Sequence, residues 1–515
     1  MKSANKPNPL LLAYYGDDFT GSTDALESLA RAGLRTVLFL QPPSAEELAA
    51  FPGLRAFGIS GGSRIMSPEQ MDRELPPAFQ AIRRSGAPII HYKTCSTFDS
   101  SPMIGSIGRA IEVGRRVFGQ CLTPLVVGFP AFGRHVVFGN LFARSGDSEP
   151  LRLDRHPMSR HPVTPMHEAD LRLHLARQTS LPIELVDVLK LRGWDCGGLS
   201  GEGCPREKAF RGTAHRYKRL ARFFTEAAAR RPPPIVLFDT LSDEDLPLIG
   251  RLISSQVRLG GQLFCAGSSG IGYALAAHWR QAGLLPLLQS DEQHRHQGPR
   301  ALEPEQTIVI SGSCSPNTDR QIGRALDAGF AEVACDSGRL ADADDAGSAI
   351  EEAIARARPA LRAGRHVIFH TARGVTDSRR VAFERVAENC AGTSKAQKMA
   401  LAGAGLGRSL GQILRRAVET TGARRAVICG GDTATQASRA LGITALEFLS
   451  PFATGAPLCR IHARESALDG CELICKGGQM GSDVFFLDLV NGRPTEARPS
   501  SDGTRSEVPT TAEAA

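Results

Sequence analysis

The sequence contains few of the side chains that bind nucleic acids. Among its 515 residues there are only two tryptophans and five tyrosines that could stack on bases. The net charge of +7 comes from 61 basic and 54 acidic residues, so the positive excess is dilute. We therefore expect no nucleic-acid partner, whereas a modest positive field suits an anionic small substrate or ATP.

Long apolar runs and paired cysteines are also missing. No run approaches the roughly 20 apolar residues that a membrane-spanning helix needs. The first apolar run, Leu10–Tyr15, is too short for a signal peptide and is interrupted by Gly16-Asp17-Asp18. The 12 cysteines include no C-x-x-C pair, so we expect reduced, mostly buried thiols rather than a zinc site. These absences predict a cytoplasmic protein without a membrane partner.

Two common nucleotide-binding motifs are absent as well. The chain has no G-x-x-x-x-G-K-[ST] loop, and no G-x-G-x-x-G follows its first predicted strand. The second absence counts against a dinucleotide-dependent dehydrogenase. Any nucleotide site must be of a less familiar kind.

Short β-branched apolar runs alternate with helical patterns along the whole chain. This alternation is typical of βαβ units, and 515 residues exceed what one compact core accommodates. We therefore predict an α/β protein with two Rossmann-like domains, largely parallel sheets and an interdomain active-site cleft. The predicted strands are Leu10–Tyr15, Thr36–Leu40, Ala56–Ile59, Ile89–Lys93, Leu125–Gly128, Ile235–Asp239, Leu263–Ala266, Thr307–Ile310, Val367–His370, Ala426–Cys429 and Leu473–Cys475.

The predicted domain boundary lies in a polar segment without periodicity. Residues 293–305 contain glycine and proline and separate the two series of strands, so we divide the chain into domains 1–299 and 300–490. A glycine-rich insertion is predicted at 194–203, and the composition of 491–515 predicts a disordered tail.

Two polar loops follow strands of the first domain. The loop Gly16–Asp24 carries three carboxylates and leads into a helix, which suits a polyhydroxylated or metal-bound ligand. The loop 93–101 offers Lys93, Asp99 and several hydroxyls, and Lys93 could pair with the carboxylate of a hydroxylated acid. Capping and turn formation are the alternative roles of these side chains.

Three small-residue loops follow strands of the second domain, namely Ser311–Pro316, Gly430–Thr435 and Lys476–Asp483. Glycines let a backbone approach phosphate, and a helix N-terminus attracts anions. Each loop alone could be a plain structural turn. Together, at the carboxyl ends of strands, they indicate one nucleotide crevice.

At these loops the chain resembles the four-carbon acid sugar kinases. The resemblance rests on Asp17–Asp24, Lys93–Ser101, Gly105–Gly108, Pro130, Gly133–Arg134, 161–166, Ser311–Pro316, Gly430–Thr433 and Lys476–Gly478. It implies a sugar-acid-binding N-terminal domain, a nucleotide-binding C-terminal domain, and ATP- and Mg²⁺-dependent phosphorylation of a hydroxyl, usually terminal. The implied substrate is 3-oxo-tetronate, threonate or erythronate, with a branched acid such as 3-oxo-isoapionate as the alternative.

The resemblance also implies site residues. The acid would contact Asp17, Asp18, Thr20, Asp24, Lys93, Ser96, Thr97, Asp99, Ser100 and Arg134, and Asp18 or Asp17 would orient the attacking hydroxyl. ATP would contact Ser311, Gly312, Ser313, Ser315, Gly430, Gly431, Asp432, Thr433, Lys476, Gly477, Gly478 and Gly481. Metal ligands are left unassigned, and a homo-oligomer is possible. An NAD-dependent sugar-acid dehydrogenase and a non-catalytic sensor remain as rival functions.

Overall fold

The computed structural model describes residues 10–119, 122–144, 149–160, 164–193, 213–285, 305–392, 395–453 and 455–493. The predicted insertion at 194–203, the predicted boundary near 300 and nearly all of the predicted tail lie outside these ranges, as do residues 161–163 of the resemblance. No described helix is long and apolar enough to cross a membrane.

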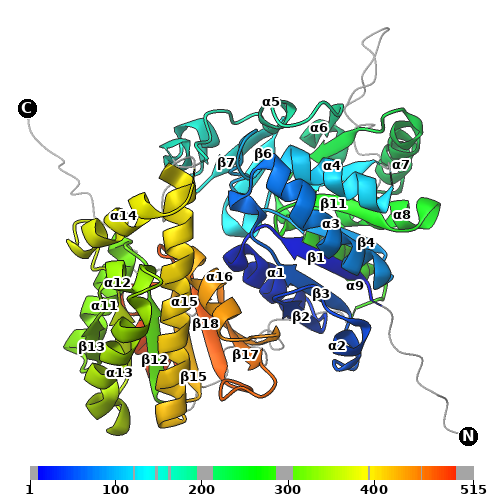
Figure 1. Ribbon diagram of the computed structural model, residues 1–515. Helices are drawn as coiled ribbons and strands as arrows, with labels where there is room; N and C mark the ends of the chain where they lie inside the picture. Colours follow the sequence, from blue (N-terminus) through cyan, green and yellow to red (C-terminus); the bar gives the residue numbers. More distant parts are fainter. Residues whose placement is uncertain are drawn as a thin grey trace, which may run out of the picture.

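The N-terminal half is a parallel sheet with helices on both faces (Figure 1). Its strands, in spatial order, are β2 (Thr36–Phe39), β3 (Ala56–Ser60), β1 (Leu12–Gly16), β4 (Ile89–Lys93), β11 (Leu263–Gly267), β5 (Thr123–Val126), β10 (Ile235–Phe238) and β9 (Ile183–Val186). One face carries α1 (Phe19–Arg31), α9 (Gly270–Gln281), α8 (Leu246–Gly260) and α7 (Thr213–Ala229), and the other carries α3 (Pro68–Arg84) and α4 (Ile107–Phe118). The short helices α2 (Ala45–Ala49), α5 (Leu171–Ala176) and α6 (Val188–Arg192) complete this half.

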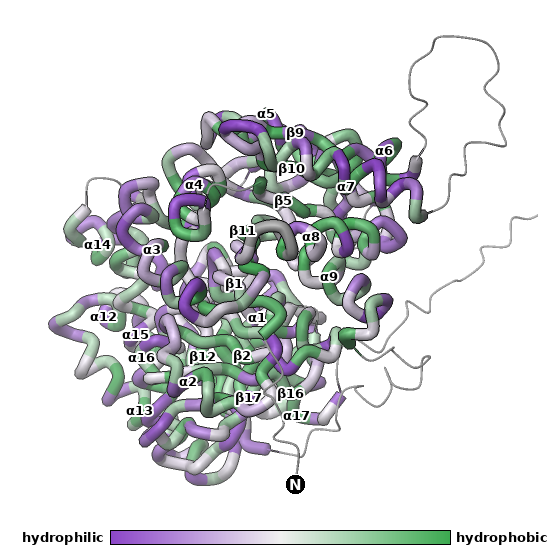
Figure 2. The backbone as a smooth tube through the Cα atoms, turned by 90° about the vertical axis from the view of Figure 1, so that its right-hand side faces the viewer, coloured by the Kyte–Doolittle hydropathy of each residue, from purple (hydrophilic) through white to green (hydrophobic). Residues whose placement is uncertain are grey.

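The alternation of side chains along β1 explains the two faces. Leu12 and Tyr14 belong to the core under α1, whereas Ala13 and Tyr15 belong to the core under α3 and α4. Both faces of the strand are therefore buried, as is usual for a parallel sheet. Figure 2 shows hydrophilic segments on outer helices such as α3 and α6.

The C-terminal half repeats this architecture. Its strands, in spatial order, are β13 (Ala331–Ala334), β14 (Val367–His370), β12 (Thr307–Ser311), β15 (Arg425–Cys429), β18 (Glu472–Lys476), β17 (Ala456–His462) and β16 (Ala445–Ala453). Helices α11 (Pro316–Asp327) and α17 (Phe485–Val490) pack on one face. The helices α12 (Ser337–Ala341), α13 (Ala346–Arg362), α14 (Arg379–Asn389), α15 (Lys395–Thr421) and α16 (Gly431–Ala440) form the other layer.

In each half there are two neighbouring strands whose following helices pack on opposite faces of the sheet. In the N-terminal half these strands are β1, followed by α1, and β4, followed by α4. In the C-terminal half they are β12, followed by α11, and β15, followed by α16. Ligands of open α/β sheets bind between such strands. All of the polar loops singled out in the sequence lie at the ends of these strands or of β18.

The two halves are joined more closely than two separate sheets would be. Among the described residues, fifteen strands form one continuous sheet, because β16 pairs antiparallel with β2 as well as with β17. The sequence did not reveal β16 and β17, since Pro451 and Pro457 interrupt their apolar patterns. Helix α1 packs against β16, β17 and α16, so the main hydrophobic core extends across both halves.

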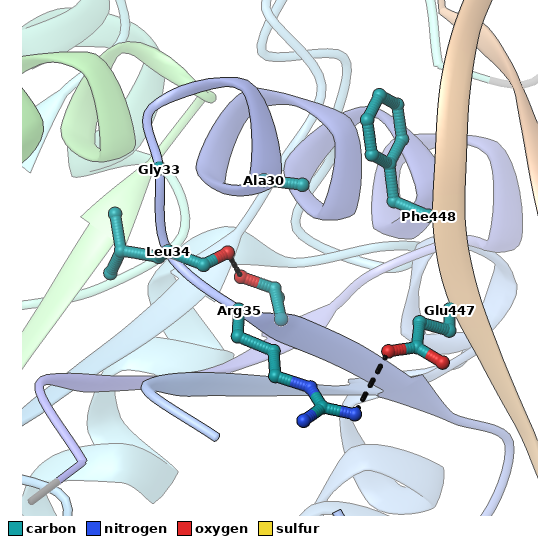
Figure 3. A pocket seen from close by; sticks show the side chains of 7 residues that line it. Ala30, Gly33, Leu34, Arg35, Glu447 and Phe448 are labelled. Carbon is teal, nitrogen blue, oxygen red and sulfur yellow. Dashed lines mark hydrogen bonds and ion pairs between the residues drawn. The ribbon is translucent and has the colours of Figure 1, made fainter. Parts of the chain in front are cut away.

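A pocket of about 220 Å³ opens at this joint (Figure 3). It lies where the loop after α1 meets β16, and Arg35 Nη2 is 3.3 Å from Glu447 Oε1 across it. Its lining residues are Ala30, Gly33, Leu34, Arg35, Thr36, Glu447 and Phe448. None of them belongs to the polar loops that the sequence singled out, so the pocket is a feature of the joint.

A second, small antiparallel sheet covers part of the N-terminal half. It consists of β6 (Arg134–Val137), β7 (Asn140–Ala143) and β8 (Leu151–Arg152). Backbone hydrogen bonds between Val136 and Thr240 attach it beyond the carboxyl end of β10. It therefore lies at the same edge of the main sheet as the polar loops.

Candidate active site at the meeting of two helix N-termini

Asp17 and Asp18 follow β1 and have different roles in the structure. Asp18 caps α1, because its Oδ1 accepts a hydrogen bond of 2.6 Å from the Gly21 N–H. Its Oδ2 accepts a hydrogen bond from Thr20 Oγ1 at 2.9 Å. Asp17 is almost completely buried, and burial together with the charge of Asp18 raises its pKa to about 6, although Arg64 opposes the shift. Asp17 therefore ionises at a higher pH than an ordinary aspartate.

Arg64 was not predicted as a site residue, but it connects the carboxylates. It lies in a single turn of 3-10 helix after β3, and its Nη1 is 2.7 Å from Asp18 Oδ2 while its Nη2 is 3.2 Å from Asp17 Oδ1. Burial disfavours its charge, but Asp17 and Asp18 hold its pKa above the usual value. The sequence signal was limited to the position of Gly61-Gly62-Ser63-Arg64 directly after the predicted strand Ala56–Ile59.

Lys93 lies at the end of β4 and forms an ion pair with Asp24. Its Nζ is 3.2 Å from Asp24 Oδ2, and the same carboxylate oxygen accepts a hydrogen bond from Ser269 Oγ. An ideal Cβ on Gly21 would lie 3.3 Å from Lys93 Nζ and 2.5 Å from Asp18 Oδ1, so the lack of a side chain at Gly21 lets these groups converge. Ser269, which follows β11, is a second neighbour of the site that the sequence reasoning missed.

The predicted residues of the loop after β4 do not all contact the groups around Asp17 and Asp18. Thr97 Oγ1 donates a 2.7 Å hydrogen bond to Asp99 Oδ1, and Arg64 Nε approaches Asp99 Oδ2 to 4.0 Å. Ser100 points away from this cluster, because its hydroxyl contacts His174 Nε2 at 2.9 Å. Ser96 is half-buried. Of the predicted residues in 96–100, Asp99 and, through it, Thr97 are connected to Arg64 and so to Asp17 and Asp18.

In the C-terminal half, the loops after β12, β15 and β18 contact one another. Gly430 N–H donates to Lys476 O at 2.9 Å, and Gly312 N–H donates to Cys429 O at 3.2 Å. Gly430 has φ = +109°, which only glycine adopts easily, and it begins α16. The loops also approach one another at Ser313, Ser315, Thr433 and Gly478. The other predicted residues Ser311, Gly477 and Gly481 lie in the same loops, with contacts inside their own loop or to the adjacent helices α11 and α17. All three predicted loops therefore form one surface.

Lys476 is the cation of this surface. It is fully buried, burial lowers its pKa, and its Nζ contacts Thr318 Oγ1 at 3.2 Å. Within the described residues, no carboxylate forms an ion pair with it. A buried ammonium without a counter-charge suits an anionic ligand.

The two groups of loops meet across the joint (Figure 1). An ideal Cβ on Gly431, at the N-terminus of α16, would lie 3.9 Å from Thr20 Cγ2, at the N-terminus of α1. Asp432 keeps access to solvent, but the surrounding protein and the charge of Asp18 raise its pKa. The helix N-termini, which both favour anions, thus lie next to each other, with Asp18 and Asp432 close enough to interact.

Two family models match the two halves of the chain. A sugar-binding N-terminal domain matches residues 12–275, and a nucleotide-binding C-terminal domain matches residues 308–486. The chain belongs to the four-carbon acid sugar kinase family. The α/β fold, the family and its phosphotransferase character agree with the predictions from sequence.

Named relatives of this family cover almost the whole chain. A 3-oxo-isoapionate kinase of Paraburkholderia graminis is 44% identical over 95% of both proteins. A 3-oxo-tetronate kinase of Methylobacterium radiotolerans is 28% identical over 93% of this chain and 99% of that protein. The crystal structure of a Salmonella typhimurium LT2 protein covers 93% of this chain and 98% of its own, with a TM-score of 0.66 at 21% identity, which shows a shared fold. The kinase names of the relatives imply ATP as the phosphate donor.

Proposed function

We propose that this protein is an ATP-dependent kinase that phosphorylates 3-oxo-isoapionate or a closely related branched oxo-acid. The similarity to the 3-oxo-isoapionate kinase carries this choice, because 44% identity extends over 95% of both chains. The 3-oxo-tetronate kinase is only 28% identical. Straight four-carbon acids, 3-oxo-tetronate first, are the second candidate substrates.

The arrangement of the two helix N-termini supports phosphoryl transfer. ATP phosphates are proposed to lie on the loops after β12, β15 and β18, where Lys476 supplies a counter-charge and the N-terminus of α16 supplies backbone N–H groups. The acid is proposed to lie beside Asp17 and Asp18. Because Gly431 approaches Thr20, the acceptor hydroxyl and the γ-phosphate would meet between the halves. This is the positioning on which phosphoryl transfer chiefly depends.

Asp17 is proposed to orient the hydroxyl and accept its proton. Its pKa of about 6 leaves it ionised but weakly stabilised at neutral pH, which suits a general base. Asp18 is engaged by the N-cap, Thr20 and Arg64, so we assign it to positioning α1 and Arg64.

Mg²⁺ fits the donors present at this place. Among the described residues no cluster of three His, Cys, Asp or Glu side chains forms a metal cage. Mg²⁺ in nucleotide sites is commonly held by phosphates, water and one or two carboxylates, and it neutralises charge on the transferred group. Asp432, which is close enough to Asp18 to interact with it, is the proposed protein ligand.

A substrate panel tests this proposal. ADP release by the purified protein is measured with ATP, Mg²⁺ and each of 3-oxo-isoapionate, 3-oxo-tetronate, D-threonate and erythronate. We expect the highest kcat/KM for 3-oxo-isoapionate. A higher value for 3-oxo-tetronate would transfer the assignment to the second candidate. ATP binding without turnover across the panel would favour a sensor, and NAD reduction by these acids would favour a dehydrogenase.

A further inference from the structure

The charges of the carboxylate cluster show where the carboxylate of an acid substrate cannot easily bind. Four carboxylates lie in the cluster, those of Asp17, Asp18, Asp24 and Asp99, and the cations that pair with them among the described residues are Arg64 and Lys93. Both cations already form ion pairs. A further carboxylate would be repelled, since like charges held close together destabilise each other. The cluster suits the hydroxyl end of an acid better than its carboxylate end.

Arg134 is a nearby cation without such compensation. It begins β6, in the loop that follows β5, and its Nη1 donates only to backbone carbonyl oxygens, those of Phe132, Gly133 and Arg144. Its Nε is buried without a hydrogen-bond partner. Within the described residues, no carboxylate forms an ion pair with Arg134. Burial therefore lowers its pKa.

The strand order places Arg134 at the same edge of the main sheet as the carboxylate cluster. The order of strands is β1, β4, β11, β5, so the loops after β1 and β5 are three strand spacings apart, about 14 Å. Arg134 therefore lies beyond the same edge of the sheet as Asp17, on the side of β5 and β10.

We propose that Arg134 binds the carboxylate of the substrate acid, so that the hydroxyl farthest from the carboxylate lies at Asp17 and is the one phosphorylated. This inference rests on the proposed function, because it orients the acid in the proposed kinase site. Lys93, which the sequence suggested as the partner of the acid carboxylate, instead holds Asp24 in position. His156, beside Arg134, has a pKa lowered by burial and by that charge, so it is neutral and does not compete as a cation.

Replacement of the substrate carboxylate tests the proposal directly. With the unmodified enzyme, the primary amide of the preferred acid should have a KM about 10- to 100-fold higher than the acid, as expected for loss of a charge-assisted hydrogen bond. The Arg134→Gln variant should raise the KM for the acid by a similar factor, keep kcat within a few-fold, and no longer distinguish acid from amide. Arg134→Lys should restore part of the preference. The exposed Arg144, which directly follows β7 of the small sheet, provides the matched control Arg144→Gln, which should retain the preference.

Product structure and binding supply independent readouts. NMR of the product should show phosphate on the hydroxyl farthest from the carboxylate, and phosphate on the nearest hydroxyl would refute the orientation. Arg134→Gln with an unchanged preference for the acid would refute the role of Arg134 while leaving the kinase assignment intact. If the unmodified enzyme phosphorylated no acid, the proposed function would fail. Stabilisation of the folded protein by the acid, lost in Arg134→Gln, would still show the contact, and equal stabilisation of both proteins would refute it.

Discussion

Replacing Asp17 with asparagine should make the enzyme inactive but more stable at alkaline pH. Asparagine resembles the protonated carboxyl group in size and lacks its charge. In the folded protein, burial raises the pKa of Asp17 from 3.8 to about 6, so ionisation is harder in the folded than in the unfolded chain. The folded state therefore carries a penalty once the pH exceeds about 6, and this penalty disappears as the pH falls through 6 towards 4.

The magnitude follows from the shift in pKa. A gap of roughly two units corresponds to about 3 kcal/mol of unfolding free energy, as an order of magnitude. Asp17→Asn should thus gain up to about 3 kcal/mol at pH 8 and almost nothing at pH 4. Turnover should fall by about 10² or more, because a general base contributes about 10²–10⁴. With the unmodified enzyme, kcat should decline as the pH falls below about 6.

Urea unfolding at pH 8, 6 and 4, combined with ADP release and ATP binding, measures all of these effects. Asp18→Asn is the comparison variant. Asparagine caps helices about as well as aspartate, but the ion pair with Arg64 is lost, so the stability of this variant should not rise at pH 8. A variant Asp17→Asn that retains most of the turnover would remove Asp17 from the reaction. A loss of stability at pH 8 that is absent at pH 4 would show that Asp17 stabilises the fold through its charge, contrary to the reasoning above.

Two further predictions concern the nucleotide loops. Gly431→Val should weaken ATP binding about tenfold or more but leave the melting temperature of the free protein unchanged, because among the described residues a Cβ there meets Thr20 Cγ2 alone, at 3.9 Å. Calorimetry measures both effects, and Gly347→Val, in open surroundings, is the control. An unchanged ATP affinity would mean that the phosphates bind elsewhere. Lys476→Met should leave the free protein at least as stable, because it removes a buried charge without a counter-ion. Its ATP affinity should fall about 10- to 100-fold. A large loss of stability without a loss of affinity would contradict the proposed role of Lys476 in binding phosphate.

The polar loops could be predicted from the sequence because each one is local. A strand pattern followed by Gly16-Asp17-Asp18 or by Gly430-Gly431-Asp432 predicts both the loop and the helix that it caps, and the structure has both. Arg64 and Ser269 were missed because their importance arises from neighbouring strands that are distant in sequence. The partner of Lys93 could not be predicted for the same reason.

The strands β16 and β17, which join the sheets of the two halves, were not predicted from the sequence. Proline normally argues against an interior strand, and Pro451 and Pro457 both lie within these elements. The pairing of β16 accommodates Pro451, because the register of β16 with β17 shifts between Phe448 and Ser450 and again between Ser450 and Ala453. Such irregular pairing has no distinct pattern in a single sequence. It nevertheless decides how the two halves are joined.

The continuous sheet limits how the halves can move during turnover. In many kinases, domain closure brings the two substrates together. Here the N-termini of α1 and α16 are already adjacent. A wide opening at the joint would have to break the pairing of β2 with β16. We expect any motion to occur at the bulges of β16, beyond the part that pairs with β2. The joint itself should stay closed.

A disulfide across the joint tests this view. Val37 and Glu447 are register partners in the antiparallel pair β2–β16, and the usual Cα separation of such pairs, about 4.5–5.5 Å, lies within the range of disulfides. The double variant Val37→Cys/Glu447→Cys, oxidised, should keep kcat within about twofold of its reduced form, with both single variants as controls for the native thiols. If oxidation abolished turnover and reduction restored it, the strands would have to separate in each cycle. The shared core of α1, β17 and α16 argues against that outcome, because separation would expose apolar side chains from both halves.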